Sequence, residues 1–199
     1  MLKPGGNNNG NKKSEEVMKG VYLAEVEIID VVDKSQTDIY GKTYDLAIEL
    51  LLKDGEYEKR KTLKGNLKRD ENGVVVNWGG AFVIDNLVKS LGIYEKFSKS
   101  EIDDVMASFE QSKIPASIIK LLKGNKVFSI SYLKGIEDGK KKYGAYSKVL
   151  PDKDKLVESF KADIANGYPS DYHPELLDDG TSFNPVELEQ VIAQVEDVI

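Results

Sequence analysis

The 199-residue chain has no cysteine, a single histidine, a single tryptophan and no long apolar run. Without cysteine the chain can form no disulfide, which fits a reducing compartment. One histidine and no cysteine argue against a zinc site, because protein zinc is held mainly by those two residue types. A membrane-spanning helix needs roughly 20 apolar residues in a row, and the sequence contains no such stretch. We therefore expect a cytoplasmic protein without disulfides, zinc or a membrane anchor.

Positive charge is missing from the last part of the chain. Residues 171–199 hold eight acidic residues and no lysine or arginine, so removing them from the net charge of −6 leaves residues 1–170 at +2. Such an acidic end can be a solubilising segment, or it can compete with nucleic acid for a basic groove or recruit partners. The Gly/Asn-rich start, residues 1–14, lacks the apolar segment of a secretory signal and is predicted to be disordered.

Recognisable catalytic motifs are also missing. Residues 40–43, YGKT, resemble the end of a phosphate-binding loop, but that motif needs glycine where Gln36 stands, so a hairpin turn is favoured. The tripeptide DGK at 138–140 has the spacing of half a metal-nuclease site, yet it lies in a predicted hairpin turn without an upstream acid. His173 lies in a proline-rich loop with no recognisable nucleophile. We expect no enzymatic activity, no cofactor and no bound metal, although a carboxylate site for magnesium or calcium stays open.

Alternating apolar residues predict strands on both sides of a helical segment. The five predicted strands are residues 20–33, 38–55, 56–68, 126–133 and 141–150. Residues 80–124 have helical spacing, with Gly92 as the C-cap of one helix and Ser100 as the N-cap of the next. Residues 151–166 are typical of an amphipathic helix, and residues 185–199 of an acidic helix.

Three strands, a helical insert and a two-strand hairpin follow the element order of an OB-fold, a five-stranded barrel with its helix between strands three and four. We therefore predict a mainly β fold with helical additions (α+β), namely an OB-fold-like barrel. Another small barrel and an α+β sandwich are the alternatives. The predicted organisation is a leader at 1–14, a barrel domain at 15–150, a flanking helix at 151–170 and an acidic tail at 171–199.

Basic residues gather in two places of this predicted barrel. Residues 53–69 carry seven basic against three acidic residues, a net charge of +4, and Lys140–Lys142 form a second cluster. Cations bind phosphates with release of counterions, and aromatic rings stack on bases. Both clusters lie on or next to strands two and three and the loop between strands four and five, which belong to the binding face of an OB-fold. The cations expected to neutralise phosphate are Lys59, Arg60, Lys61, Lys64, Lys68, Arg69, Lys140, Lys141 and Lys142.

Aromatic residues near these clusters divide by their position along the strands. The rings expected to be exposed for base stacking, because they lie at strand ends, are Tyr40, Tyr143 and Tyr146. Tyr44 and Tyr57 share the parity of apolar neighbours and are expected to face the core. Trp78 is expected either to pack under the helix that follows or to stack on a base. A charged strand can equally be a solvated face, and that alternative stays open.

In its overall arrangement the chain resembles phage-type single-stranded DNA-binding proteins. The resemblance rests on two basic segments, YEKRKTLKGNLKR at 57–69 and GKKKYGAYSKV at 139–149, and on the acidic end at 175–199 that follows them. It implies an OB-fold domain at 15–150 that binds nucleic acid, and an acidic end that contacts replication or recombination proteins and competes with DNA. Many members of that family end in acids and an aromatic residue, whereas this chain ends with Glu196-Asp197-Val198-Ile199.

The leading hypothesis is thus a non-catalytic single-stranded DNA-binding protein that coats replication or recombination intermediates. If a phage encodes it, it would act in the host cell cytoplasm. The alternative is a protein-interaction or virion-assembly module whose charges only keep its surface solvated. A metal nuclease that uses Asp138 is a third hypothesis.

Overall fold

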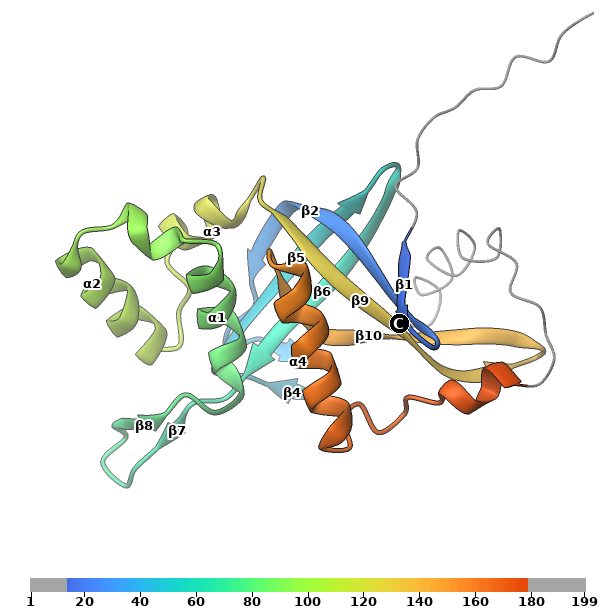
Figure 1. Cartoon of the computed structure of the whole chain (residues 1–199). Helices are drawn as coiled ribbons and strands as arrows, with labels where there is room; N and C mark the ends of the chain where they lie inside the picture. The colour runs from blue at the N-terminus through green and yellow to red at the C-terminus, as the bar shows by residue number, and fades with distance from the viewer. Residues whose placement is uncertain (1–13, 179–199) are drawn as a thin grey trace, which may run out of the picture.

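The long strands of the protein curve into a nearly closed five-stranded antiparallel barrel, shown by the computed structural model, which describes residues 14–178 (Figure 1). They are β2 (Val21–Asp33), β5 (Leu46–Asp54), β6 (Tyr57–Gly65), β9 (Lys126–Glu137) and β10 (Lys140–Leu150). Their order in the sheet is β10-β9-β2-β5-β6, so β6 and β10 are the two edges that meet where the barrel nearly closes. This is an OB-like α+β fold, which confirms the prediction from the element order.

Three short pairings extend the barrel at its loops. They join β1 (Glu15–Met18) to β2, β3 (Asp38–Ile39) to β4 (Lys42–Thr43), and β7 (Lys68–Arg69) to β8 (Val75–Asn77). The prediction of one strand over 38–55 is wrong, because Tyr40 and Gly41 turn the chain with φ of 53° and 77°. That turn confirms YGKT as a hairpin, and only Leu46–Asp54 joins the barrel.

Helices between β6 and β9 cover one end of the barrel, as the predicted helical insert requires. They are η1 (Gly79–Ala81), α1 (Phe82–Ser90), η2 (Ile93–Lys96), α2 (Lys99–Glu110) and α3 (Ala116–Leu122). After β10 come α4 (Lys153–Ala165) and η3 (Pro174–Asp178). Within residues 14–178, no helix has the length and apolar character needed to cross a membrane. The predicted acidic helix at 185–199 and all but the last residue of the predicted leader lie outside the described residues.

The ends of two helices test the predicted caps. The C-cap of α1 is Leu91 and not the predicted Gly92, which follows one residue later in the left-handed conformation, with φ of 64°, where glycine commonly terminates a helix. The N-cap of α2 is Ser98 and not the predicted Ser100. Ser98 accepts from the backbone N–H of Glu101, and the Glu101 carboxylate accepts from the backbone N–H of Ser98 at 2.8 Å. This reciprocal pair needs a glutamate three residues after the cap, which Ser98 has and Ser100 lacks.

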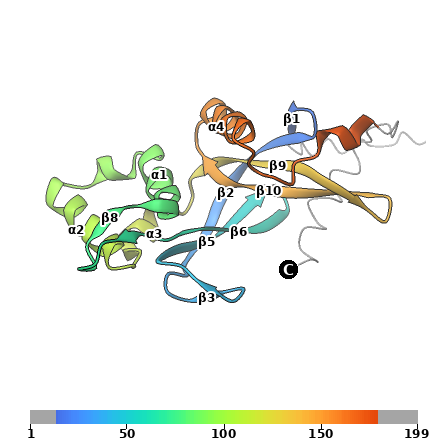
Figure 2. The same cartoon turned by 90° about the horizontal axis from the view of Figure 1, so that it is seen from below.

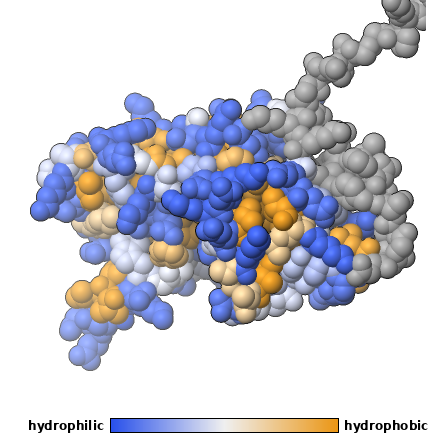
Figure 3. Space-filling model, viewed as in Figure 1, coloured by the Kyte–Doolittle hydropathy of each residue, from blue (hydrophilic) through white to orange (hydrophobic). Residues whose placement is uncertain are grey.

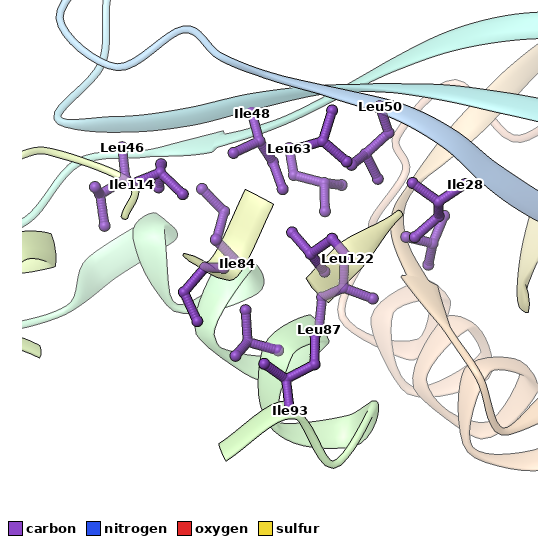
Figure 4. Packing of buried hydrophobic residues seen from close by; sticks show 14 of the residues in the cluster. Ile28, Leu46, Ile48, Leu50, Leu63, Ile84, Leu87, Ile93, Ile114 and Leu122 are labelled. Atoms are coloured by element: carbon purple, nitrogen blue, oxygen red, sulfur yellow. The ribbon is translucent and has the colours of Figure 1, made fainter. Parts of the chain in front are cut away.

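Apolar side chains of the barrel meet those of α1 and α3 at what we call the helix-covered end (Figure 4). The buried residues that meet there include Leu46, Ile48, Leu63, Ile84, Leu87 and Leu122. Burying one Leu or Ile side chain stabilises a fold by roughly 1.5–3 kcal/mol. This end of the barrel therefore holds much of the apolar core.

A second cluster packs α4 and the following segment against the outside of β9 and β10. Leu156 and Phe160 of α4 are buried against Tyr146 of β10, whose hydroxyl donates to Asp163 at 2.5 Å. The ring of Tyr172 lies 6.0 Å from that of Phe160. The chain after α4 thus stays in contact with the barrel up to η3.

Candidate nucleic-acid interface

Strand β6 divides the predicted basic cluster between its two faces. Side chains alternate along a strand, so Lys59 and Lys61 share the inward face with Leu63, whereas Arg60 and Lys64 point outward. The sequence predicts phosphate contact for all four lysine and arginine side chains. Only Arg60 and Lys64 lie on the outer surface of the barrel.

Lys64 lies over an aromatic ring near the end of β6. Its Nζ is 4.7 Å from the centroid of the Tyr44 ring, a cation–π contact. Tyr44 is half-buried and lies outside the main apolar cluster, so the prediction that it faces the core is wrong. The reason is that β5 begins only at Leu46, so its alternation does not extend back to Tyr44.

Two side chains fix this contact by joining the start of β5 to the end of β6. Asp45 Oδ2 accepts from the backbone N–H of Leu67 at 2.9 Å, and Asn66 Oδ1 accepts from the backbone N–H of Asp45 at 3.0 Å. In the preceding β3–β4 hairpin Tyr40 is 76% exposed, which confirms its prediction. Figure 2 shows this hairpin on the opposite side of the barrel from α4.

The hairpin also carries an exposed cation that the sequence prediction missed, Lys42. Its position next to Tyr40 in a YGKT turn could have identified it. We call the set at this end of the barrel the basic–aromatic patch, and it consists of Tyr40, Lys42, Tyr44 and Lys64. It combines the two kinds of side chain that bind a single strand.

The middle of the outer face carries both signs of charge. Arg60 forms an ion pair with Glu49 at 2.5 Å, and Lys53 of β5 lies opposite Glu58 of β6. Exposed ion pairs contribute about 0–1 kcal/mol to stability, but they reduce the positive charge that a phosphate meets. The basic–aromatic patch is therefore the more favourable anion surface of the two.

Trp78 packs on one side and lines a hollow on the other. Its ring meets that of Phe109 edge-on, with centroids 5.8 Å apart. The same residue lines a hollow of about 630 Å³ together with Val76, Phe82 and Met106. Val76 and Phe82 are 62% and 46% exposed, and Figure 3 shows apolar surface over the β7–β8 hairpin. Trp78 thus packs as expected, although against Phe109 of α2, and base stacking stays a prediction.

Gly65 and Gly79 let the start of the helical insert approach the end of β6. A Cβ on Gly65 would lie only 1.9 Å from the carbonyl carbon of Gly80. One on Gly79, whose φ is +49°, would lie 2.5 Å from the carbonyl oxygen of Asn66. This close approach places the Trp78 hollow next to the end of β6, where Lys68 pairs with Asn77.

Arg69 holds the β7–β8 hairpin against α2. Its guanidinium donates to the carbonyls of Glu110 at 2.5 Å and Gly73 at 3.1 Å. These donors are thus engaged within the protein, and Lys68 is the more available cation of the pair predicted here.

Two of the three rings predicted to be exposed at strand ends are buried, and the prediction for them is wrong. Tyr143 is 8% and Tyr146 3% exposed. Tyr143 packs edge-on against Tyr22, with centroids 5.6 Å apart, and Tyr146 lies under α4. The β9–β10 hairpin turns at Asp138-Gly139, so both tyrosines lie inside the strand rather than at its end. Tyr57 is 38% exposed and so does not fill the core as predicted, since it stands at the β5–β6 turn.

The second basic cluster occupies the start of β10. Lys140 is exposed, Lys141 is half-buried, and Lys142 forms an ion pair with Glu137 at 3.2 Å. Asp138 and Gly139 have φ of 51° and 73°, which confirms the predicted hairpin turn. This cluster lies at the turn of the β9–β10 hairpin, whereas Lys64 of the basic–aromatic patch lies on β6 opposite β5.

On the inward face, Lys59 and Lys61 reach across the barrel to β9 and β10, respectively. Lys59 Nζ donates to Ser129 Oγ at 2.8 Å, and Lys61 Nζ donates to the carbonyl of Tyr146. Burial lowers the pKa of Lys59, although Asp54 acts in the opposite direction. Burial, helped by the charge of Lys59, lowers the pKa of Lys61 to about 7. The two amines are the most perturbed lysines of the strand.

Residues 14–178 contain no group of three or more His, Asp or Glu side chains placed to hold a metal ion. His173 lies at the surface, where its Nδ1 is 2.8 Å from Glu175 Oε1. Asp138 stands in the hairpin turn described above.

Comparison with protein-family models, with curated proteins and with solved structures found no match for this chain. A functional assignment therefore depends on the side chains described above. Three features bear on it: the basic–aromatic patch, the Trp78 hollow and the inward lysine pair.

Proposed function

We propose that this chain is a single-stranded DNA-binding protein that holds DNA along the basic–aromatic patch. The observation that carries the proposal is the Lys64 ammonium over the Tyr44 ring, next to the exposed Tyr40 on an OB-like barrel. OB-folds bind oligonucleotides on strands two and three and the loop 1–2, positions that β5, β6 and residues 34–45 occupy here. Cations there would neutralise phosphates while rings stack on bases.

The path of the bound DNA can be extended from the basic–aromatic patch along the end of β6. Lys68 is exposed and lies opposite Asn77, which lines the Trp78 hollow. A base stacked on Trp78 would leave its phosphate close to Lys68. In the cell the protein would coat replication or recombination intermediates without catalysing a reaction, in the host cytoplasm if a phage encodes it.

The test is fluorescence anisotropy with a labelled oligothymidylate of about 30 bases, at about 50 and 300 mM salt. We expect binding at low salt that weakens steeply as salt rises, because bound phosphates release counterions. The double substitution Tyr40→Ala and Lys64→Gln should weaken binding, whereas Lys120→Gln on exposed α3 should not. No affinity at low salt, confirmed at several protein concentrations, would overturn the proposal.

The acidic end gives this proposal a regulatory component. Residues 179–199 hold five acids and no lysine or arginine, and a segment of that charge would compete with DNA for the patch. The truncation must begin after Asp178, because Tyr172 and η3 pack onto the barrel. We expect the chain truncated after residue 178 to bind the oligonucleotide more tightly than the full chain, most clearly at low salt. Equal affinity would make the acidic end a solubilising segment.

A protein-interaction module is the second candidate, favoured by exposed apolar side chains at the β7–β8 hairpin. Val74 is 59% exposed in the hairpin, and Val76 and Phe82, which line the hollow, are 62% and 46% exposed. Association through such a surface would persist at high salt, because apolar contacts do not depend on counterion release. Light scattering at both salt concentrations separates the two candidates.

A further inference from the structure

The barrel is not closed by a backbone ladder between β6 and β10. These strands are the two ends of the sheet order, and no backbone pairing joins them among the described residues. The two inward lysines reach across instead, Lys61 to the carbonyl of Tyr146 in β10 and Lys59 to Ser129 in the neighbouring strand β9. We call this place the β6–β10 seam.

An irregularity in the pairing of β10 with β9 frees a backbone carbonyl at the seam. The pairing of β10 with β9 jumps from Ala145 opposite Ser131 to Val149 opposite Ser129. Residues 146–148 therefore leave the ladder, and the freed carbonyl of Tyr146 accepts from Lys61. Two amines of β6, a hydroxyl of β9 and a carbonyl of β10 thus converge on one place.

The seam holds two lysine amines without an ion-paired acid. Among the residues that the structure describes, neither Lys59 nor Lys61 has a carboxylate as an ion-pair partner, and the other interactions of both are the two hydrogen bonds named above. Asp54 is the acid that acts on Lys59, and only through its field. As whole residues both lysines are partly exposed, while burial of their amines lowers the pKa of each. Burying unpaired charge is costly, and an anion in the seam would remove that cost.

The donors favour a polyoxyanion over a single carboxylate. Each ammonium has three N–H donors and spends one on the contacts described, and the Ser129 oxygen that accepts from Lys59 keeps its own O–H to donate. A phosphate group offers several oxygens to donors that approach from different strands, and lysine binds phosphate as a point charge. We propose that Lys59, Lys61 and Ser129 form a phosphate-binding site in the β6–β10 seam, for inorganic phosphate or for one phosphodiester of a nucleic acid.

This site does not depend on the proposed function, because it lies on the opposite face of β6 from Lys64. If DNA binds only outside, the seam takes free phosphate, and if DNA enters the seam, the strand supplies the phosphate. The lowered pKa of Lys61, about 7, makes the site pH-dependent. Phosphate should bind better below pH 7, where Lys61 is protonated.

Thermal unfolding of the full chain near pH 6.5 tests the site, with sodium phosphate compared with sodium chloride at equal ionic strength. Phosphate at about 100 times its dissociation constant should raise Tm by roughly 5–10 °C over the chloride value. Lys61→Met and Lys59→Met should each abolish this phosphate-specific rise. Lys64→Met, the matched change on the outer face, should keep it.

NMR of the lysine side chains provides a second readout that does not depend on stability. Phosphate should shift the Lys61 resonances and raise its pKa, with no comparable change at Lys64. Oligothymidylate binding by Lys61→Met then identifies the source: weakened binding means that DNA enters the seam, and unchanged binding means that free phosphate is the ligand. The proposal is overturned if wild type responds to phosphate no more than to chloride, or if both methionine variants retain the response.

Discussion

The two ends of the barrel interior use the same strands and fill them differently. At the helix-covered end β6 presents Leu63 and β9 presents Val127, both buried against apolar neighbours. Two and four residues earlier on β6 the same face presents Lys61 and Lys59, and β9 presents Ser129. α1 and α3 cover the first end, whereas the second is bridged only by lysine side chains. The inward-facing side chains of the same strands thus form a packed apolar core at one end and a polar seam at the other.

The difference teaches where stability and binding reside in this fold. Apolar side chains under the helices gain free energy from burial. Two half-buried ammonium groups without an acid cost free energy instead. Buried titratable groups that lower stability, and that apolar packing has not replaced, tend to cluster at functional sites. This is why we assign a ligand to the seam. Substitutions at the two ends should therefore change stability in opposite directions.

Leu87→Ala should show the largest effect. Leu87 of α1 is completely buried in the main cluster, and a buried Leu→Ala change costs roughly 2–5 kcal/mol because a cavity remains. Urea unfolding followed by circular dichroism measures the loss. Val76→Ala, at a site that is 62% exposed, is the control and should change stability by less than about 0.5 kcal/mol. Equal losses for the two variants would show that α1 does not seal the barrel.

Lys61→Met should have a smaller effect of opposite sign. The pKa of Lys61 is about 7 in the folded protein against an ordinary value of 10.5. Between these pH values the unfolded chain binds more protons, so the free energy of unfolding of wild type rises with pH. Methionine removes the cost of the buried charge, and we expect a gain of roughly 1–3 kcal/mol near pH 6 that fades toward pH 10.

The measurement is urea unfolding of both proteins from pH 6 to pH 10 in phosphate-free buffer. Lys64→Met is the matched control, and its effect should stay small and independent of pH, because Lys64 lies on the outer face. A Lys61→Met protein less stable than wild type at pH 6 would mean that the hydrogen bond to Tyr146 outweighs the buried charge.

Much of the fold could be predicted because its local patterns agree with its tertiary structure. The alternation in β2, the Asp138-Gly139 turn and the spacing of α1 each point to the element that forms. The failures arise where packing decides. Tyr143 and Tyr146 look accessible in a lysine-rich strand, but Tyr22, from the distant strand β2, covers the first, and α4, which folds back over β10, covers the second.

The candidate site was less predictable for a related reason. Alternation groups Lys59 and Lys61 with Leu63, yet lysine on a strand normally marks a solvated face, so their inward direction runs against composition. Only the approach of β9 and β10 to β6 gives the two amines partners, Ser129 for Lys59 and the Tyr146 carbonyl for Lys61. Tyr44 shows the opposite error. Its parity predicted that it faces the core, but the bend before β5 places its ring under the Nζ of Lys64.

Ser98→Ala should have the smallest effect and tests how far the helix-covered end extends outward. Ser98 caps α2, whose first turn is exposed, so the lost stability is confined to one helix end. An N-cap serine contributes about 1 kcal/mol to the free energy of unfolding. Ser100→Ala, at the position that the sequence favours as the cap, should change urea stability by less than about 0.5 kcal/mol. The pKa of Glu101, lowered by the backbone N–H and then the hydroxyl of Ser98, should rise in Ser98→Ala and stay low in Ser100→Ala. Equal responses of the two variants, in stability and in the Glu101 titration, would contradict the reciprocal cap and place α2 outside the cooperative core that Leu87 reports.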